Sequence, residues 1–185
     1  MSEYNRMQLV KRRFFAMRNG IVADALRRLS PSYRMIFGLN LPQIAEVAAS
    51  VHPDAAFAEE LWADRRTRES LLVAPMIYPA AEMDEATALR WMCDVRDTEV
   101  ADVLCHRLLR RLPFARRLAE ECASSESDML RYTALRLMRN IMNQDAAAAV
   151  EMARRELDRD VPLTRALCLN IIDETEFLLE PDNEK

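Results

Sequence analysis

Glycine and lysine are scarce in this sequence. Only two glycines, Gly20 and Gly38, occur in 185 residues, too few for a chain of β-hairpins or a glycine-rich phosphate-binding loop. Lysine occurs only at Lys11 and Lys185, so almost all positive charge comes from arginine. Arginine is the better bidentate ligand for phosphate and carboxylate groups, but a compositional bias of the genome explains the same count more simply.

Cysteine and histidine are also few, and long apolar runs are absent. The two histidines and the scattered cysteines do not have the spacing of metal ligands, so we expect no metal and no cofactor. No apolar run approaches the roughly 18 residues of a membrane span, and we see no signal peptide. We therefore expect a cytoplasmic protein without membrane contact, with reduced thiols at Cys93, Cys105, Cys122 and Cys168.

Helix-forming residues dominate the rest of the composition, with leucine, alanine, arginine, glutamate and methionine prominent. Mixed-charge helix ends, tight turns and apolar-striped helices recur as pairs along the chain. This pattern predicts an all-α fold, a HEAT-like repeat solenoid or α-α superhelix. We expect one domain over residues 1–179, with capping helices in residues 1–30, a disordered tail at residues 180–185, and a monomer.

The segment 97–113 is the most informative helix. The pattern predicts one continuous helix with a core stripe through Leu104 and Leu108, an N-cap at Asp97 and a stop at Pro113. Asp102 lies about 120° from the centre of that stripe. The simplest interpretation is that Asp102 pairs with His106 one turn later; the alternative is that Asp102 faces a groove between helices.

The net charge of −4 means that attraction to nucleic acid would require a segregated basic face. The predicted helices place several arginines near the acid of the 97–113 segment and on the helix that follows Ser127. We also interpret Trp62 and Trp91 as core residues. The arginines on these helices are Arg107, Arg110, Arg111, Arg131, Arg136 and Arg139.

Several motifs together resemble the AlkD-type DNA alkylation-repair family. Gly38 followed by Pro42-Gln43-Ile44-Ala45 is similar to the start of the family's first repeat. Leu61-Trp62 followed by residues 68–74 resembles its Leu-Trp…Glu…Leu-Ala unit. Residues 98–102 lie where the family has Trp-x-x-x-Asp, and residues 130–134 lie where it has a helix with arginine followed by alanine.

The resemblance implies a HEAT-like solenoid that binds duplex DNA, alkylated or not. Active members excise cationic N-alkylated purines without a metal, so it implies a DNA glycosylase in which Asp102 is the catalytic acid and Arg131 the phosphate anchor. A carboxylate facing an oxocarbenium-like sugar is chemically reasonable for such a leaving group. Thr98 replaces the family's tryptophan and would contact DNA without the cation–π surface of an aromatic ring.

Three hypotheses remain open from the sequence. The first is a DNA-binding solenoid of the alkylation-repair type that can excise alkylpurines through Asp102 and Arg131, and in which the six arginines Arg107, Arg110, Arg111, Arg131, Arg136 and Arg139 share one DNA-binding face. The second is a catalytically inactive HEAT-like relative that binds DNA structure. The third is a protein-binding HEAT-like module, which the sequence pI of about 5.4 and the small size favour.

Overall fold

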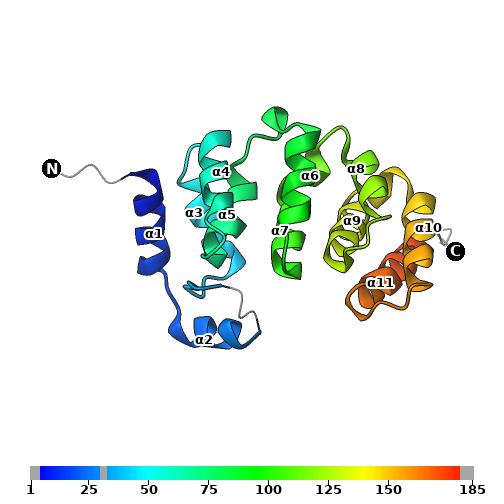
Figure 1. Ribbon diagram of the computed structural model, residues 1–185, viewed down its shortest axis with the longest axis horizontal. Helices are drawn as coiled ribbons and strands as arrows, with labels where there is room; N and C mark the ends of the chain where they lie inside the picture. Colours follow the sequence, from blue (N-terminus) through cyan, green and yellow to red (C-terminus); the bar gives the residue numbers. More distant parts are fainter. Residues whose placement is uncertain (1–4, 30–32, 180–185) are drawn as a thin grey trace, which may run out of the picture. The chain divides into compact units, whose positions relative to one another are not determined.

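The computed structural model describes residues 5–29 and 33–179, and within these ranges the chain is helical with no strand (Figure 1). The only strand-like pairing among them is an isolated bridge between Met35 and Thr67. The all-α prediction is therefore confirmed. The predicted disordered tail, residues 180–185, lies outside the described residues. Contacts divide the chain into two compact units, residues 1–83 and 84–185, and the expected single domain stays a prediction.

The first unit has five α-helices and one 3-10 turn among its described residues. Asn40 caps α3 through a reciprocal pair of hydrogen bonds with Gln43, and Asp54 caps α4 by accepting from the Phe57 N–H. The four-residue link between α4 and α5 makes them antiparallel neighbours. The elements are α1 (Arg6–Ala16), α2 (Gly20–Leu29), α3 (Leu41–Ala49), α4 (Ala55–Ala63), α5 (Arg68–Ile77) and η1 (Ala80–Glu82).

A buried ion pair holds the segment before α3 in place. Glu69 is fully buried and accepts hydrogen bonds from the backbone N–H groups of Phe37 (3.1 Å) and Gly38 (3.0 Å). Arg68 pairs with Glu69 at 2.9 Å and donates to the Leu39 carbonyl oxygen. Glu69 and Gly38, which belong to two of the family-like motifs, are thus joined by a hydrogen bond that fixes the segment before α3.

The second unit continues the pattern of helix pairs. Links of four or five residues join α8 to α9 and α10 to α11, and both pairs pack closely. Helices α7, α9 and α11 also contact one another in succession, forming one layer (Figure 1). The elements are α6 (Glu85–Asp94), α7 (Thr98–Arg107), η2 (Leu109–Arg111), α8 (Ala115–Cys122), α9 (Asp128–Ile141), η3 (Met142–Gln144), α10 (Ala146–Leu157) and α11 (Pro162–Leu179).

The predicted continuous helix over residues 97–113 is wrong at its C-terminal end. The α-helix stops at Arg107, Leu108 leaves helical geometry at φ −124° and ψ −65°, and a 3-10 turn follows. The break buries both Leu108 and Leu109 completely, whereas adjacent residues on one amphipathic helix point about 100° apart. As a consequence Arg110 and Arg111 lie on η2 and not on α7.

The tryptophans belong to the core, as predicted. Trp62 on α4 is 2% exposed and Trp91 on α6 is fully buried. Each lies in its own unit among other fully buried side chains, Phe57 and Leu72 in the first and Met92 and Leu104 in the second. Neither indole is therefore available to stack on a ligand.

Candidate nucleic-acid interface

Asp102 lies on α7 and faces α9, within the second unit. Its Oδ1 accepts a hydrogen bond from the Tyr132 hydroxyl at 3.1 Å, and Arg136 Nε lies 3.0 Å from the same oxygen. The side chain is 36% exposed. The partners of Asp102 are thus Tyr132 and Arg136 on the neighbouring helix, and not His106, which was the simplest interpretation of the sequence.

Burial controls the electrostatics of this carboxylate. Desolvation raises the pKa of Asp102 above its usual value, and the charge of Arg136 and the Tyr132 hydrogen bond only partly offset that effect. Desolvation, with the nearby Asp102 charge, raises the pKa of Tyr132 to about 12. Tyr132 is therefore a hydrogen-bond donor at neutral pH, and Asp102 is an anion whose charge Arg136 already balances.

Two arginines on α9 extend this polar row toward α11. Arg139 makes a two-point contact with Glu174 of α11, with Nε 2.9 Å from Oε2 and Nη2 against Oε1. The hydrogen bond from Arg139 and its charge keep the pKa of Glu174 low. The row therefore crosses three helices, with the acids Asp102 and Glu174 at its ends and the cations Arg136 and Arg139 between them.

Two buried side-chain donors of α9 are incompletely paired. The buried atoms Arg136 Nε and Asn140 Nδ2, one turn apart on α9, have no hydrogen-bond partner in the described part of the chain; the Arg136 Nε–H does not point at the nearby Asp102 oxygen. Buried unpaired donors are uncommon and costly in folded proteins. Both atoms are covered by the surrounding protein, so neither is open to a ligand in this structure.

Positive charge is concentrated at the C-terminal end of α7. Arg107, Arg110 and Arg111 are all exposed, and none forms an ion pair with a residue in the described ranges. Desolvation, followed by repulsion from Arg110 and Arg107, lowers the pKa of His106. Arg136 of the polar row contributes to the same repulsion.

Arg131 lies apart from this set. The family resemblance implies that Arg131 is a phosphate anchor, but the structure leaves its side chain only 4% exposed. Its Nε contacts both carboxylate oxygens of Glu156 at 2.9 and 3.1 Å, and its other nitrogens donate to Asp128 and to the Ser125 carbonyl oxygen. A guanidinium with three protein partners holds α9 against α10 and has little capacity left for a phosphate.

Thr98 lies one turn before Asp102 on α7 and is partly exposed. The structure therefore brings Thr98, Asp102, Arg136 and Arg139 to one region of the second unit. In residues 5–29 and 33–179 there is no cluster of three side chains suited to a metal ion, and no helix is long and apolar enough to cross a membrane.

Sequence reasoning missed the aromatic and acidic partners of the polar row. Tyr132, Arg136 and Arg139 recur on α9 at intervals of four and three residues, which is the spacing of one helix face. That spacing could have identified Tyr132. Glu174 carries no comparable local signal, because its partner Arg139 is 35 residues earlier in the chain.

Comparison with known proteins assigns a family to this arrangement. Residues 10–179 match the family model described as "DNA alkylation repair enzyme". The chain belongs to this family. No curated protein matches the sequence.

One solved structure supports the fold of this DNA alkylation repair family member. It is described as "a new family of proteins related to the HEAT-like repeat DNA glycosylases with affinity for branched DNA structures". The match has a TM-score of 0.76 at 15% sequence identity and covers 88% of this chain and 72% of the other. Similarity at this level of identity shows a shared HEAT-like helical-repeat fold, which confirms the predicted fold class.

Proposed function

We propose that this protein binds DNA, including branched DNA, without removing a base. The observation that carries the proposal is the group of exposed arginines at the C-terminal end of α7 and on η2. Arg107, Arg110 and Arg111 are exposed and form no ion pair with a carboxylate in the described ranges. Phosphate oxygens are acceptors with the matching charge. The structural relative with affinity for branched DNA supports the same ligand class.

Two features argue against base excision. Arg136 lies 3.0 Å from the Asp102 carboxylate and Tyr132 donates to it, so its negative charge is already compensated. A compensated carboxylate stabilises a developing sugar cation less than a free one does. Thr98 also provides no aromatic ring to hold a cationic base.

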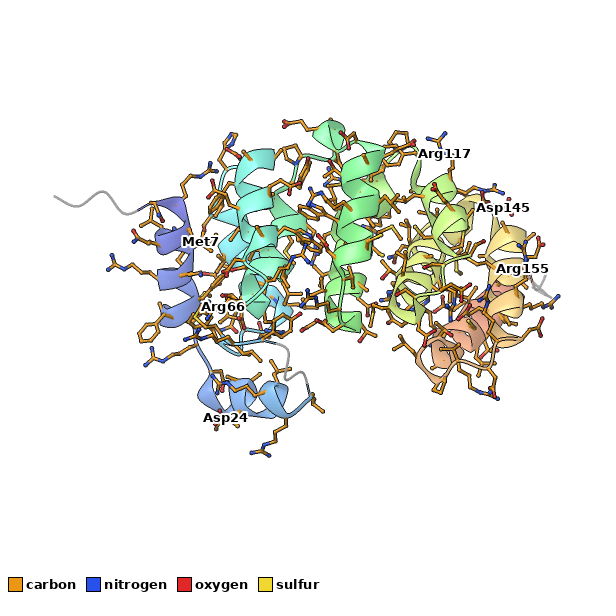
Figure 2. All side chains as sticks on the ribbon, viewed as in Figure 1. Met7, Asp24, Arg66, Arg117, Asp145 and Arg155 are labelled. Atoms are coloured by element: carbon orange, nitrogen blue, oxygen red, sulfur yellow. The ribbon has the colours of Figure 1, made fainter. Side chains whose placement is uncertain are left out.

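The proposal is tested by binding of a four-way DNA junction, measured by fluorescence anisotropy. Replacing Arg107, Arg110 and Arg111 together by alanine removes three phosphate contacts, and we expect the affinity to fall at least about tenfold. Arg155→Ala and Arg165→Ala are matched controls, because these exposed arginines pair with Glu151 and Asp160; Arg155 is labelled on α10 in Figure 2. Equal affinities for the triple variant and the controls would contradict the proposal.

Base excision through Asp102 is the second candidate. Its support is that the Asp102 side chain is 36% exposed and that burial raises its pKa, both of which are features of functional carboxylates. Release of methylated purine from alkylated duplex DNA by the wild-type protein, abolished in Asp102→Asn with DNA affinity retained, would establish this activity in place of binding alone.

A further inference from the structure

Positive charge is strongly concentrated at the start of the chain. Residues 1–40 contain eight cationic side chains and two acidic ones, a net charge of +6 in a chain whose total is −4. The remaining residues therefore carry a net charge of −10. A basic segment in an acidic protein is suited to a polyanionic ligand, and the interface on the second unit does not use it.

Two shallow hollows occupy this basic segment, within the first unit, and Phe15 lies between them. One has a volume of about 660 Å³ and the other about 260 Å³, and both are lined by Phe15, Met35 and Phe37. The charged residues among their described lining are all cationic: Lys11 and Arg12 in the first hollow, and Arg18, Arg27 and Arg34 in the second. Two of them already pair with acids, Lys11 with Asp64 and Arg27 with Asp24. Met7 and Asp24, labelled in Figure 2, mark α1 and α2, the helices that contribute most of this lining.

Phe15 has the features of a stacking surface. Its side chain is 56% exposed, and the Arg18 guanidinium carbon lies 3.9 Å from the ring centroid. The guanidinium is fixed there by a 3.0 Å hydrogen bond to the Phe15 carbonyl oxygen. An aromatic ring combined with arginine is the usual platform for bases that are not paired in a duplex.

The floor of the hollows is rigid. The backbone N–H of Met35 donates to Arg66 and its carbonyl oxygen accepts from Arg68. Glu69 holds the Phe37 N–H, and the rings of Phe37 and Phe14 lie 5.7 Å apart. A preformed surface loses little conformational entropy when it binds a ligand.

We propose that this surface, which we name the Phe15 platform, binds unpaired nucleotides of DNA. The bases stack on Phe15 over the apolar floor, and Arg18 and Arg34, which form no ion pair with a described residue, contact the phosphates. This inference rests on the proposed DNA-binding function. It specifies that the first unit binds the unpaired nucleotides of a branched DNA. An acidic amphipathic helix fits less well, because such a helix needs a continuous groove and Phe15 divides this surface into two hollows.

The test uses a DNA duplex with a short single-stranded flap that contains 2-aminopurine, whose fluorescence is quenched by stacking. We expect the wild-type protein to quench it and to bind the flap substrate more tightly than the blunt duplex. Phe15→Ala should abolish the quenching and lower the flap affinity about tenfold, with the blunt-duplex affinity unchanged. Phe15→Tyr keeps an aromatic ring and should retain both properties.

Leu9→Ala is the matched control, because Leu9 is an exposed apolar residue of α1 outside the lining of both hollows. Circular dichroism verifies that each variant is folded. Unchanged quenching and flap affinity in Phe15→Ala would overturn the inference while junction binding through Arg107, Arg110 and Arg111 stands. Binding of a glutamate-rich amphipathic peptide that depends on Phe15, with flap binding unaffected, would overturn it in favour of a protein partner. Absence of any DNA binding would overturn both proposals.

Discussion

Asp102 shows how a single carboxylate can be conspicuous in the sequence and still take unexpected partners. Its place off the apolar stripe of α7 was predictable from helical periodicity. Its partners were not, because Tyr132 and Arg136 are 30 or more residues later and meet it only through helix packing. The sequence therefore identifies Asp102 as a candidate. The residues that balance the charge of Asp102 become apparent only in the tertiary structure.

The raised pKa of Asp102 has a consequence for stability. The folded protein holds this proton more tightly than the unfolded chain does, so Asp102 favours the folded state at acid pH, below the unfolded value of 3.8. That contribution is lost as the pH rises through the raised pKa. We expect the stability of the wild-type protein relative to Asp102→Asn, measured by urea unfolding, to fall with rising pH and then level off.

Asp84 provides the opposite case within the same protein. It caps α6, and its hydrogen bond from the Thr87 N–H lowers the pKa of Asp84. The stability of the wild-type protein relative to Asp84→Asn should therefore rise with pH from the lowered pKa to the unfolded value. If relative stability changed with pH in the same direction for both variants, desolvation would not be the main influence on the pKa of Asp102.

Arg131 tests whether a residue of the predicted site is structural. Arg131→Met removes the nearest cation from Glu156, which is 5% exposed, and leaves it only Arg159 at 3.6 Å and the Thr164 hydroxyl. We expect a loss of about 3 kcal/mol in the free energy of unfolding, with unchanged DNA affinity in the folded protein. Arg155→Met, at an exposed pair on α10, should change stability by less than about 1 kcal/mol. Weaker DNA binding at unchanged stability would restore Arg131 as a phosphate anchor.

At the scale of elements, local signals predicted where helices start better than where they end. The caps at Asp54, Asp84 and Asp97 follow from side chains that accept an N–H three residues later. The end of α7 at Arg107 has no such signal, because consecutive Leu108 and Leu109 are equally compatible with a continuing helix. The break is decided by the burial of both side chains.

Gly38 is the position where the link between α2 and α3 requires glycine. Its φ is +79°, and a Cβ atom there would lie 2.3 Å from the Asn19 carbonyl oxygen and 2.7 Å from the Ala23 nitrogen. We expect Gly38→Ala to destabilise the protein by about 2 kcal/mol or more, measured by chemical unfolding.

Gly20 is the natural control for that substitution. It is the first residue of α2, and an added Cβ meets no atom within 4 Å. Gly20→Ala should be neutral or stabilising by up to about 1 kcal/mol, because alanine reduces the conformational freedom of the unfolded chain. Equal effects of the two substitutions would contradict the structural role of Gly38.

At the scale of the whole molecule, charge is distributed unevenly along an acidic chain. The net charge of −4 pointed away from nucleic acid, but residues 1–40 alone carry +6, and three exposed arginines follow the end of α7. The fold class was predictable from helix-pair periodicity. The site was only partly predictable, because its charge balance depends on pairs such as Arg139–Glu174 that join distant segments.

The salt dependence of junction binding tests the central claim, phosphate contact through the exposed arginines at the end of α7 and on η2, most directly. The logarithm of the binding constant should fall linearly with the logarithm of salt concentration, with a slope of about −0.9 for each phosphate contact. The triple variant with alanine at Arg107, Arg110 and Arg111 should reduce the magnitude of that slope by about 3. A wild-type slope near zero, or identical slopes for the wild-type protein and the triple variant, would contradict this account.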